Sequence, residues 1–143
     1  MRVLGIDPGG TTGAAVVVAP GIVARPADLV YAQEFEFEAF LDALHEIIGL
    51  AELVAVERYT IGPRTIKFSR QPQALYAIGA IMAECRKSRV EMVLQNPADA
   101  KSAFSDGTLK LFGMHSPSPH VRDATRHALL ACRRGGVDVH TGV

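Results

Sequence analysis

Four side chains in this sequence have the chemistry to bind a divalent metal ion, and they come from three separate segments. Asp7 closes an apolar segment just before the turn Pro8-Gly9-Gly10, and Glu57 closes a second apolar segment. His120 and Asp123 stand three residues apart at the start of a helical pattern, so they project from one side of its first turn. Carboxylate oxygens are the ligands that magnesium and manganese prefer. The set therefore predicts a metal cluster of three acids and an imidazole.

Some of these residues also have ordinary structural explanations. An Asp before Pro-Gly-Gly is a common turn former, His120 alone fits a helix start, and Asp123 suits the dipole of a first turn. Glu57 is harder to explain in this way, because a buried ionised acid needs a partner or a metal. If the strands ending at Asp7 and Glu57 are parallel neighbours, their carboxylates emerge side by side and repel unless a cation lies between them. His127 falls on the same side of the last helix as the two metal-binding candidates.

Hydrophobic periodicity predicts an α/β fold in which strands lead and helices then alternate with strands. Strands are expected over 2–7, 13–18, 29–37, 53–57 and 90–94, and helices over 38–48, 73–87, 96–101, 108–112 and 119–134. Three leading strands fit an antiparallel meander, and the later alternation implies parallel strands joined by helical crossovers. We expect a single domain over residues 1–143, with a mixed five-stranded sheet and helices on both of its faces.

The long helix over 73–87 is predicted to carry Leu75, Ile78 and Met82 on its apolar face. Gly79 and Ala83 lie beside them, one turn apart, and make part of this face unusually small. Such a face permits close packing, either against a second subunit or against the core of the same chain.

The last helix has clear signals at both ends. Ser118 can cap its start, Pro119 suits its first position, and Gly135-Gly136 ends it. Its core stripe is expected to comprise Val121, Ala124, Ala128, Leu129 and Cys132.

Charge is distributed unevenly along a chain whose formal net charge is zero. Residues 28–57 contain acids and no Lys or Arg, whereas residues 58–70 contain Arg58, Arg64, Lys67 and Arg70 and no acid. Further basic residues follow in 86–89 and in the last helix. A basic loop can hold phosphates through counterion release, although solvated helix faces explain any one of these runs equally well.

Composition favours a cytoplasmic protein with free thiols. Cys85 and Cys132 lie far apart without metal-ligand spacing, and no segment has the length and hydropathy of a signal peptide or a membrane helix.

Several motifs resemble those of RuvC-type Holliday junction resolvases, which belong to the ribonuclease H-like superfamily. VLGIDPGGTTG is similar to that family's first strand and turn, LVAVERY to its strand ending in a catalytic Glu, QNPADAK to the segment after its fifth strand, and HVRDATRHALLA to its final helix. They occur in the family's order and cover essentially the whole chain. The resemblance implies that Asp7, Glu57, His120 and Asp123 bind two magnesium ions, which manganese can replace. One ion would activate the attacking water and the other would stabilise the leaving 3′ oxygen. His120 either binds metal or helps to deliver the water.

The resemblance also implies a substrate and an assembly. A compact, phage-type member would act on branched DNA as a homodimer in a bacterial or phage-infected cell. Its DNA contacts would come from Lys101 and from the basic loop, that is Arg58, Arg64, Lys67 and Arg70. Tyr59 and Phe68 are both candidates for the aromatic residue that stacks on an unpaired base, and simple packing explains Tyr59 equally well.

The chain departs from the bacterial resolvases in its shorter length, its lower net charge and a compressed segment between Lys101 and His120, which leaves other functions to weigh. An RNA-processing nuclease of the same fold, acting on ribosomal RNA precursors, shares the short length and the N-terminal motif. DPGGTTG is also similar to the phosphate-binding hairpin of actin-like ATPases, but those proteins need two such domains and are much longer. A junction-binding protein without catalysis is disfavoured, because unpaired carboxylates weaken phosphate binding unless metal offsets them.

Overall fold

The structure, a computed structural model, describes residues 1–20, 27–60 and 72–135. Its elements are β1 (Arg2–Asp7), β2 (Thr11–Val18), β3 (Asp28–Glu36), α1 (Phe37–Ile48), β4 (Leu53–Glu57), α3 (Gln73–Ser88), β5 (Glu91–Gln95), α4 (Pro97–Ala103), α5 (Asp106–Leu111) and α6 (Pro119–Arg134). None of the helices in these ranges has the length and hydropathy needed to cross a bilayer.

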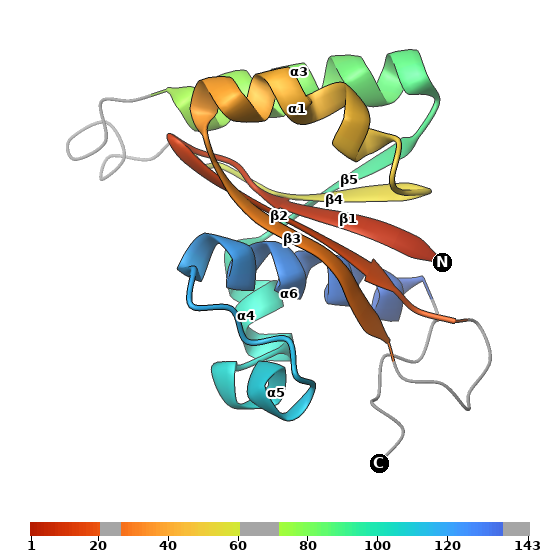
Figure 1. Cartoon of the computed structure of the whole chain (residues 1–143), viewed down its shortest axis with the longest axis vertical. Helices are drawn as coiled ribbons and strands as arrows, with labels where there is room; N and C mark the ends of the chain where they lie inside the picture. Colours follow the sequence, from red (N-terminus) through yellow and green to blue (C-terminus); the bar gives the residue numbers. More distant parts are fainter. Residues whose placement is uncertain (21–26, 61–71, 136–143) are drawn as a thin grey trace.

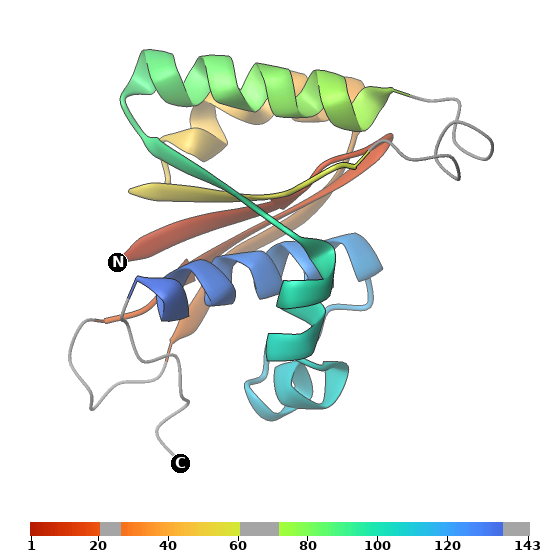
Figure 2. The same cartoon turned by 180° about the vertical axis from the view of Figure 1, so that it is seen from behind.

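The strands form one mixed sheet in the order β3-β2-β1-β4-β5. β2 pairs antiparallel with β1 and with β3, while β4 lies parallel between β1 and β5. Figure 1 shows α1 and α3 on one face of the sheet and α4, α5 and α6 on the other, and Figure 2 shows the same layers from behind. The predicted mixed five-stranded sheet, with antiparallel strands first and parallel crossovers after them, is confirmed.

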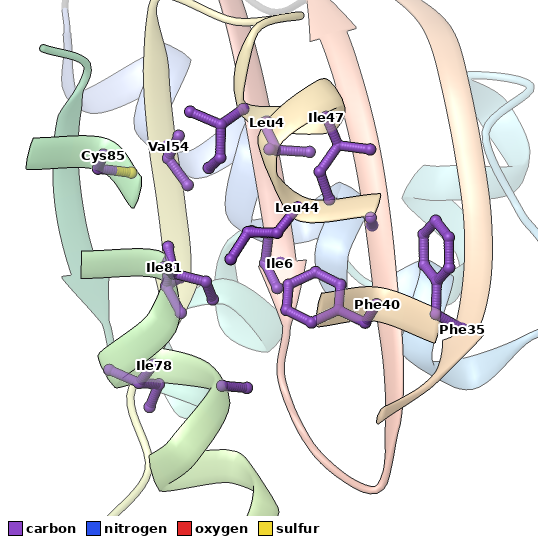
Figure 3. Close-up of a cluster of buried hydrophobic side chains, with 14 of the residues drawn as sticks. Leu4, Ile6, Phe35, Phe40, Leu44, Ile47, Val54, Ile78, Ile81 and Cys85 are labelled. Carbon is purple, nitrogen blue, oxygen red and sulfur yellow. The ribbon is translucent and has the colours of Figure 1, made fainter. Parts of the chain in front are cut away.

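Alternation along β1 divides the hydrophobic core into two layers. Leu4 and Ile6 belong to the buried cluster beneath α1 and α3 (Figure 3). Val3 belongs to a second cluster, which is covered by α6. Because successive side chains of a strand point to opposite faces, Gly5 and Asp7 share the face of Val3. The last residue of β1 is therefore directed toward α6.

The predicted apolar face of α3 is only partly covered by the sheet. Ile78 packs in the core, whereas Leu75 and Met82 are 38% and 53% exposed. Gly79 and Ala83 are exposed as well and make no core contact within the described residues. Apolar residues occur on more than one side of this helix, so their spacing alone did not identify the side that packs on the sheet. The residues that α3 buries are Ala74, Ala77, Ile78, Ile81 and Cys85.

Two glycines allow α6 to lie directly on the sheet. A Cβ atom added to Gly5 in β1 would lie 1.8 Å from the carbonyl oxygen of Ala124. One added to Gly13 in β2 would lie 2.1 Å from the carbonyl oxygen of His120. Both distances are far below van der Waals contact, so a larger residue at either position would push the helix away. The two glycines therefore set the height of α6 above the strands.

The ends of α6 follow the sequence signals. The Ser118 hydroxyl accepts a hydrogen bond from the backbone N–H of Val121 and donates one to the Glu34 carboxylate of β3. This residue both caps the helix and ties it to the sheet. Pro119 is the first helical residue and Gly135 is the C-cap, as predicted. The predicted core stripe is buried throughout: Val121, Ala124, Ala128, Leu129 and Cys132.

Candidate metal centre

A row of residues crosses the sheet at the carboxyl ends of β1 and β4. Asp7 pairs with Gly13 of β2, and Glu57 pairs with Gln95 of β5. β1 and β4 are parallel and stay in register up to the residue before each carboxylate. Asp7 and Glu57 therefore leave the sheet side by side, as expected for neighbouring parallel strands.

The first half of α6 crosses this row and contributes three polar side chains. His120, Asp123 and His127 are separated by three and four residues, so they project from one side of the helix. Nδ1 of His120 lies 3.0 Å from Oδ2 of Asp7, and Nε2 of His127 lies 3.0 Å from Oε2 of Glu57. The helix thus contacts both strand ends through imidazole rings. The close approach at the two glycines makes these short contacts possible.

Asp7, Glu57 and Asp123 form a cluster of three partly buried carboxylates. One oxygen of each lies within 4.8 Å of the others. Burial is the largest of the effects that raise the pKa of Asp7 to about 7, and the negative charge of Glu57 is the next. The hydrogen bond with His120 acts in the opposite direction but does not cancel the rise. The cluster therefore holds more negative charge than its protein neighbours compensate.

His120 is held by one ring nitrogen and leaves the other available. Its side chain is 42% exposed, and Nδ1 bonds to Asp7. Nε2 makes no hydrogen bond to another residue in the described part of the chain. The imidazole can therefore exchange a proton with a bound molecule or coordinate a metal at the edge of the cluster.

Two further residues that the sequence analysis did not assign to the site lie behind Glu57. His127 is fully buried, and its Nδ1 lies 2.9 Å from Oε1 of Gln95. Sequence spacing had placed His127 on the correct side of α6 but gave no partner for it. Gln95 could have been found from the strand alternation, because it ends β5 beside Glu57 on the same face.

Asp123 is held by a buried arginine from the same helix. Nη1 of Arg126 donates to Oδ1 of Asp123 at 2.7 Å, and its Nε donates to the carbonyl oxygen of Phe104 at 2.7 Å. Nη2 of Arg126 donates to the carboxylate of Asp106. Lys101 lies on the other oxygen of Asp123, with Nζ 4.0 Å from Oδ2. Two cations therefore offset part of the charge on this side of the cluster.

The residues predicted to bind nucleic acid fall into two groups. Arg58 is exposed directly after Glu57, and Lys101 is exposed beside Asp123. Tyr59 is half-buried and packs against the cluster beneath α3, which favours its packing role. The remaining predicted contacts lie outside the described residues: Arg64, Lys67, Phe68 and Arg70.

The donor set of the cluster suits a hard divalent cation. Three carboxylate oxygens lie close enough to share one ion. The raised pKa of Asp7 reflects repulsion and burial that a cation would offset. Oxygen donors of this kind favour magnesium or manganese over metals that prefer thiolates. The residues present therefore fit the predicted class of cofactor.

The chain matches solved structures but has no match among protein-family models or curated proteins. RuvC of Thermus thermophilus superposes with a TM-score of 0.70 at 22% identity, covering 96% of this chain and 98% of that one. RuvC of the same organism in complex with a Holliday junction substrate gives a TM-score of 0.68 at 23% identity, covering 95% and 97%. Fowlpox virus resolvase in complex with Holliday junction DNA gives 0.57 at 10% identity, covering 94% and 98%.

These likenesses extend over nearly the full length of both chains in each pair. The chain has the ribonuclease H-like fold of RuvC-type resolvases, which confirms the fold that the motifs predicted. At this level of identity, activity must be argued from the site itself.

Proposed function

We propose that this chain is a metal-dependent endonuclease that cuts branched DNA, with the four-way Holliday junction as its substrate. The observation that carries the proposal is the cluster of Asp7, Glu57 and Asp123 at the end of the central parallel strands. Two of the matching structures hold Holliday junction DNA, which supports the choice of substrate. The activity would serve DNA recombination and repair.

The proposed cofactor is magnesium, held by Asp7, Glu57 and Asp123, with manganese as a substitute. A bound divalent cation supplies positive charge that stabilises the phosphate under attack and the departing 3′ oxygen. The proposal includes two ions in each site. The protein's own contribution is to hold three carboxylates in a partly buried position, where the lower dielectric strengthens their attraction for a cation.

His120 is proposed to accept a proton from the attacking water. Its bond to Asp7 through Nδ1 fixes the ring and leaves Nε2 as the proton acceptor. An imidazole exchanges protons readily near neutral pH, where the reaction must proceed.

DNA is proposed to approach the cluster along exposed basic side chains. Lys101 is close enough to Asp123 to contact a phosphate beside the cluster, and Arg58 follows Glu57 directly. Further contacts are proposed from the basic loop, with Arg64, Lys67, Phe68 and Arg70, and from Tyr59 where its ring is accessible. Binding should weaken as salt rises, because each phosphate contact releases counterions.

We also propose a homodimer, because two cuts related by a two-fold axis are needed to resolve a four-way junction. The proposed interface is the outer side of α3 with the neighbouring edge strand β5. Leu75, Met82 and Leu94 are 38%, 53% and 37% exposed there. Two adjoining hollows on this surface share Arg58 and Leu94 among their lining residues.

The dimer can be tested by placing a charge in this apolar surface. Met82→Glu should convert the protein to a monomer in sedimentation analysis, because an unpaired buried charge is costly. Leu41→Glu is the matched control, since Leu41 is an exposed leucine of α1, 37% accessible. A dimer that survives Met82→Glu would place the interface elsewhere.

The substrate can be tested with end-labelled four-way junction, fork, flap, linear duplex and structured RNA, each with magnesium or chelator. Paired, symmetric nicks in the junction with magnesium are expected. Preference for forks or flaps would indicate a broader branch nuclease, and cleavage of RNA alone would indicate an RNA-processing nuclease. No metal-dependent cleavage of any substrate would contradict the proposed function.

A further inference from the structure

A chain of three hydrogen-bonded side chains lies behind the metal centre. It runs from Gln95 at the end of β5 through His127 of α6 to Glu57 at the end of β4. Gln95 is 3% exposed and His127 is 0% exposed, so neither is accessible to bulk water. The two bonds measure 2.9 Å and 3.0 Å.

The geometry determines where His127 carries its proton. An ionised carboxylate can only accept hydrogen bonds, so Nε2 of His127 must donate to Glu57. Nδ1 then accepts a hydrogen bond from the side-chain amide of Gln95, whose nitrogen must take the position facing the ring, because the amide oxygen cannot donate. With both ring nitrogens bonded to side chains, His127 has no nitrogen left to coordinate a metal.

We propose that His127 is a positioning residue for the metal centre: it holds one oxygen of Glu57 and so directs the other toward Asp7 and Asp123. This inference rests on the proposed function, because it concerns the same cation. Gln95 fixes the imidazole in turn. Hydrogen bonds from neighbouring side chains orient ligating carboxylates in metal sites, and their loss typically weakens metal affinity.

Comparison with the two buried threonines supports a role at the site, as does buried Arg126, which also bonds to side chains there. In the described part of the chain, Thr12 and Thr125 are also buried, but each bonds to nearby backbone: Thr12 to Gly9 and Thr125 to the carbonyl oxygen of Val121. His127 instead bonds to side chains of two different strands. An apolar residue would fit the surrounding core, where the neighbouring Ala128 and Leu129 are buried. Burial of a polar ring there is costly unless its bonds are made.

The test is Mn²⁺ binding to the full-length, metal-free protein, measured from the electron paramagnetic resonance signal of free Mn²⁺. His127→Phe keeps a ring of similar size without hydrogen bonds and should weaken Mn²⁺ affinity by about 10- to 100-fold. His127→Gln can place an amide N–H near the position of Nε2 and should recover most of that loss. Thr125→Val is the matched control: it removes a buried hydrogen bond from the same helix and should leave Mn²⁺ affinity unchanged.

A second measurement keeps the proposal testable if His127→Phe does not fold. Nitrogen NMR of the imidazoles in the metal-free wild type should show a proton held on Nε2 of His127. Two results would overturn the role of His127 but leave the metal centre intact. One is a wild type that binds Mn²⁺ although Nε2 of His127 carries no proton in the metal-free protein. The other is a folded His127→Phe variant that binds Mn²⁺ as tightly as wild type. A wild type that binds no Mn²⁺ would overturn the metal centre and this inference with it.

Discussion

Because α6 packs directly against Gly5 of β1, we predict that one methyl group added at Gly5 will disrupt the metal centre without touching its ligands. In Gly5→Ala, the new Cβ would start 1.8 Å from the Ala124 carbonyl oxygen and 2.8 Å from the Ala128 nitrogen. The first distance must reach at least 3.0 Å, so the helix or the strand must move by more than about 1 Å. All of these contacts are backbone atoms, which cannot rotate away. We expect a loss of stability of about 3 kcal/mol, at the upper end of what overpacking costs.

The same movement shifts Asp123 relative to Asp7, so cleavage should fall on the order of 100-fold in the fraction that remains folded. Urea unfolding and single-turnover cleavage measure the two effects. Gly107→Ala is the control, because its Cβ would meet only the Ser105 hydroxyl at 3.7 Å. Wild-type stability and a wild-type cleavage rate in Gly5→Ala would refute the account of how α6 is positioned.

Three further predictions concern charge at the site. Below pH 7, Asp7 holds a proton that the cation must displace. Mn²⁺ affinity should therefore fall by up to about tenfold per pH unit below 7 and level off above it. Calorimetric titration on either side of pH 7 measures this, and an unchanged Mn²⁺ affinity would contradict it. The raised pKa also means that the contribution of Asp7 to the stability of the metal-free protein is fully present below the ordinary value of 3.8 and is lost as pH rises through about 7. Asp7→Asn should therefore stabilise the metal-free protein above pH 7 by up to about 4 kcal/mol, and a less stable variant in urea with chelator would contradict the assignment. Arg126→Met should lower the free energy of unfolding by about 3–5 kcal/mol, because it leaves partly buried Asp123 without its donor. Arg134→Met, which breaks an exposed pair with Asp99, should change it by less than about 1 kcal/mol, and equal losses in the two variants would contradict the reasoning.

The strand ends of the site could be predicted because their signals are local. An Asp before a glycine turn and a Glu that closes an apolar strand mark positions at the edge of a sheet. The sequence left open whether the strands ending at Asp7 and Glu57 are parallel neighbours, and the observed parallel pairing of β1 with β4 brings the two carboxylates together. The start of α6 was equally readable from Ser118 and Pro119.

Features that depend on packing between distant segments could not be predicted in the same way. Gly5 lies within an apolar strand, and only its contact with α6 explains why this position has no side chain. His127 lies in an apolar stripe, and its spacing does not reveal that Gln95 and Glu57 flank it.

The basic run of α6 was also ambiguous from sequence. These arginines could have formed a surface for phosphates, but in the structure several of them contact other residues of the same chain. Arg126 bonds to Asp123 and Asp106, and Arg133 lies over the ring of Phe104 with its guanidinium carbon 4.3 Å from the ring centre. Sequence gives the sign of a charge but not the partner that folding brings to it.

The measurement that tests the central claim most directly is single-turnover cleavage of a labelled four-way junction by wild type and Asp123→Asn, with protein in excess of DNA and binding followed in parallel. Loss of one cluster carboxylate should abolish magnesium-dependent cutting while junction binding persists, because binding relies on the basic side chains. Cutting by Asp123→Asn at the wild-type rate, or cutting by the wild type in the presence of chelator, would contradict the claim that this cluster holds the cation used for cleavage.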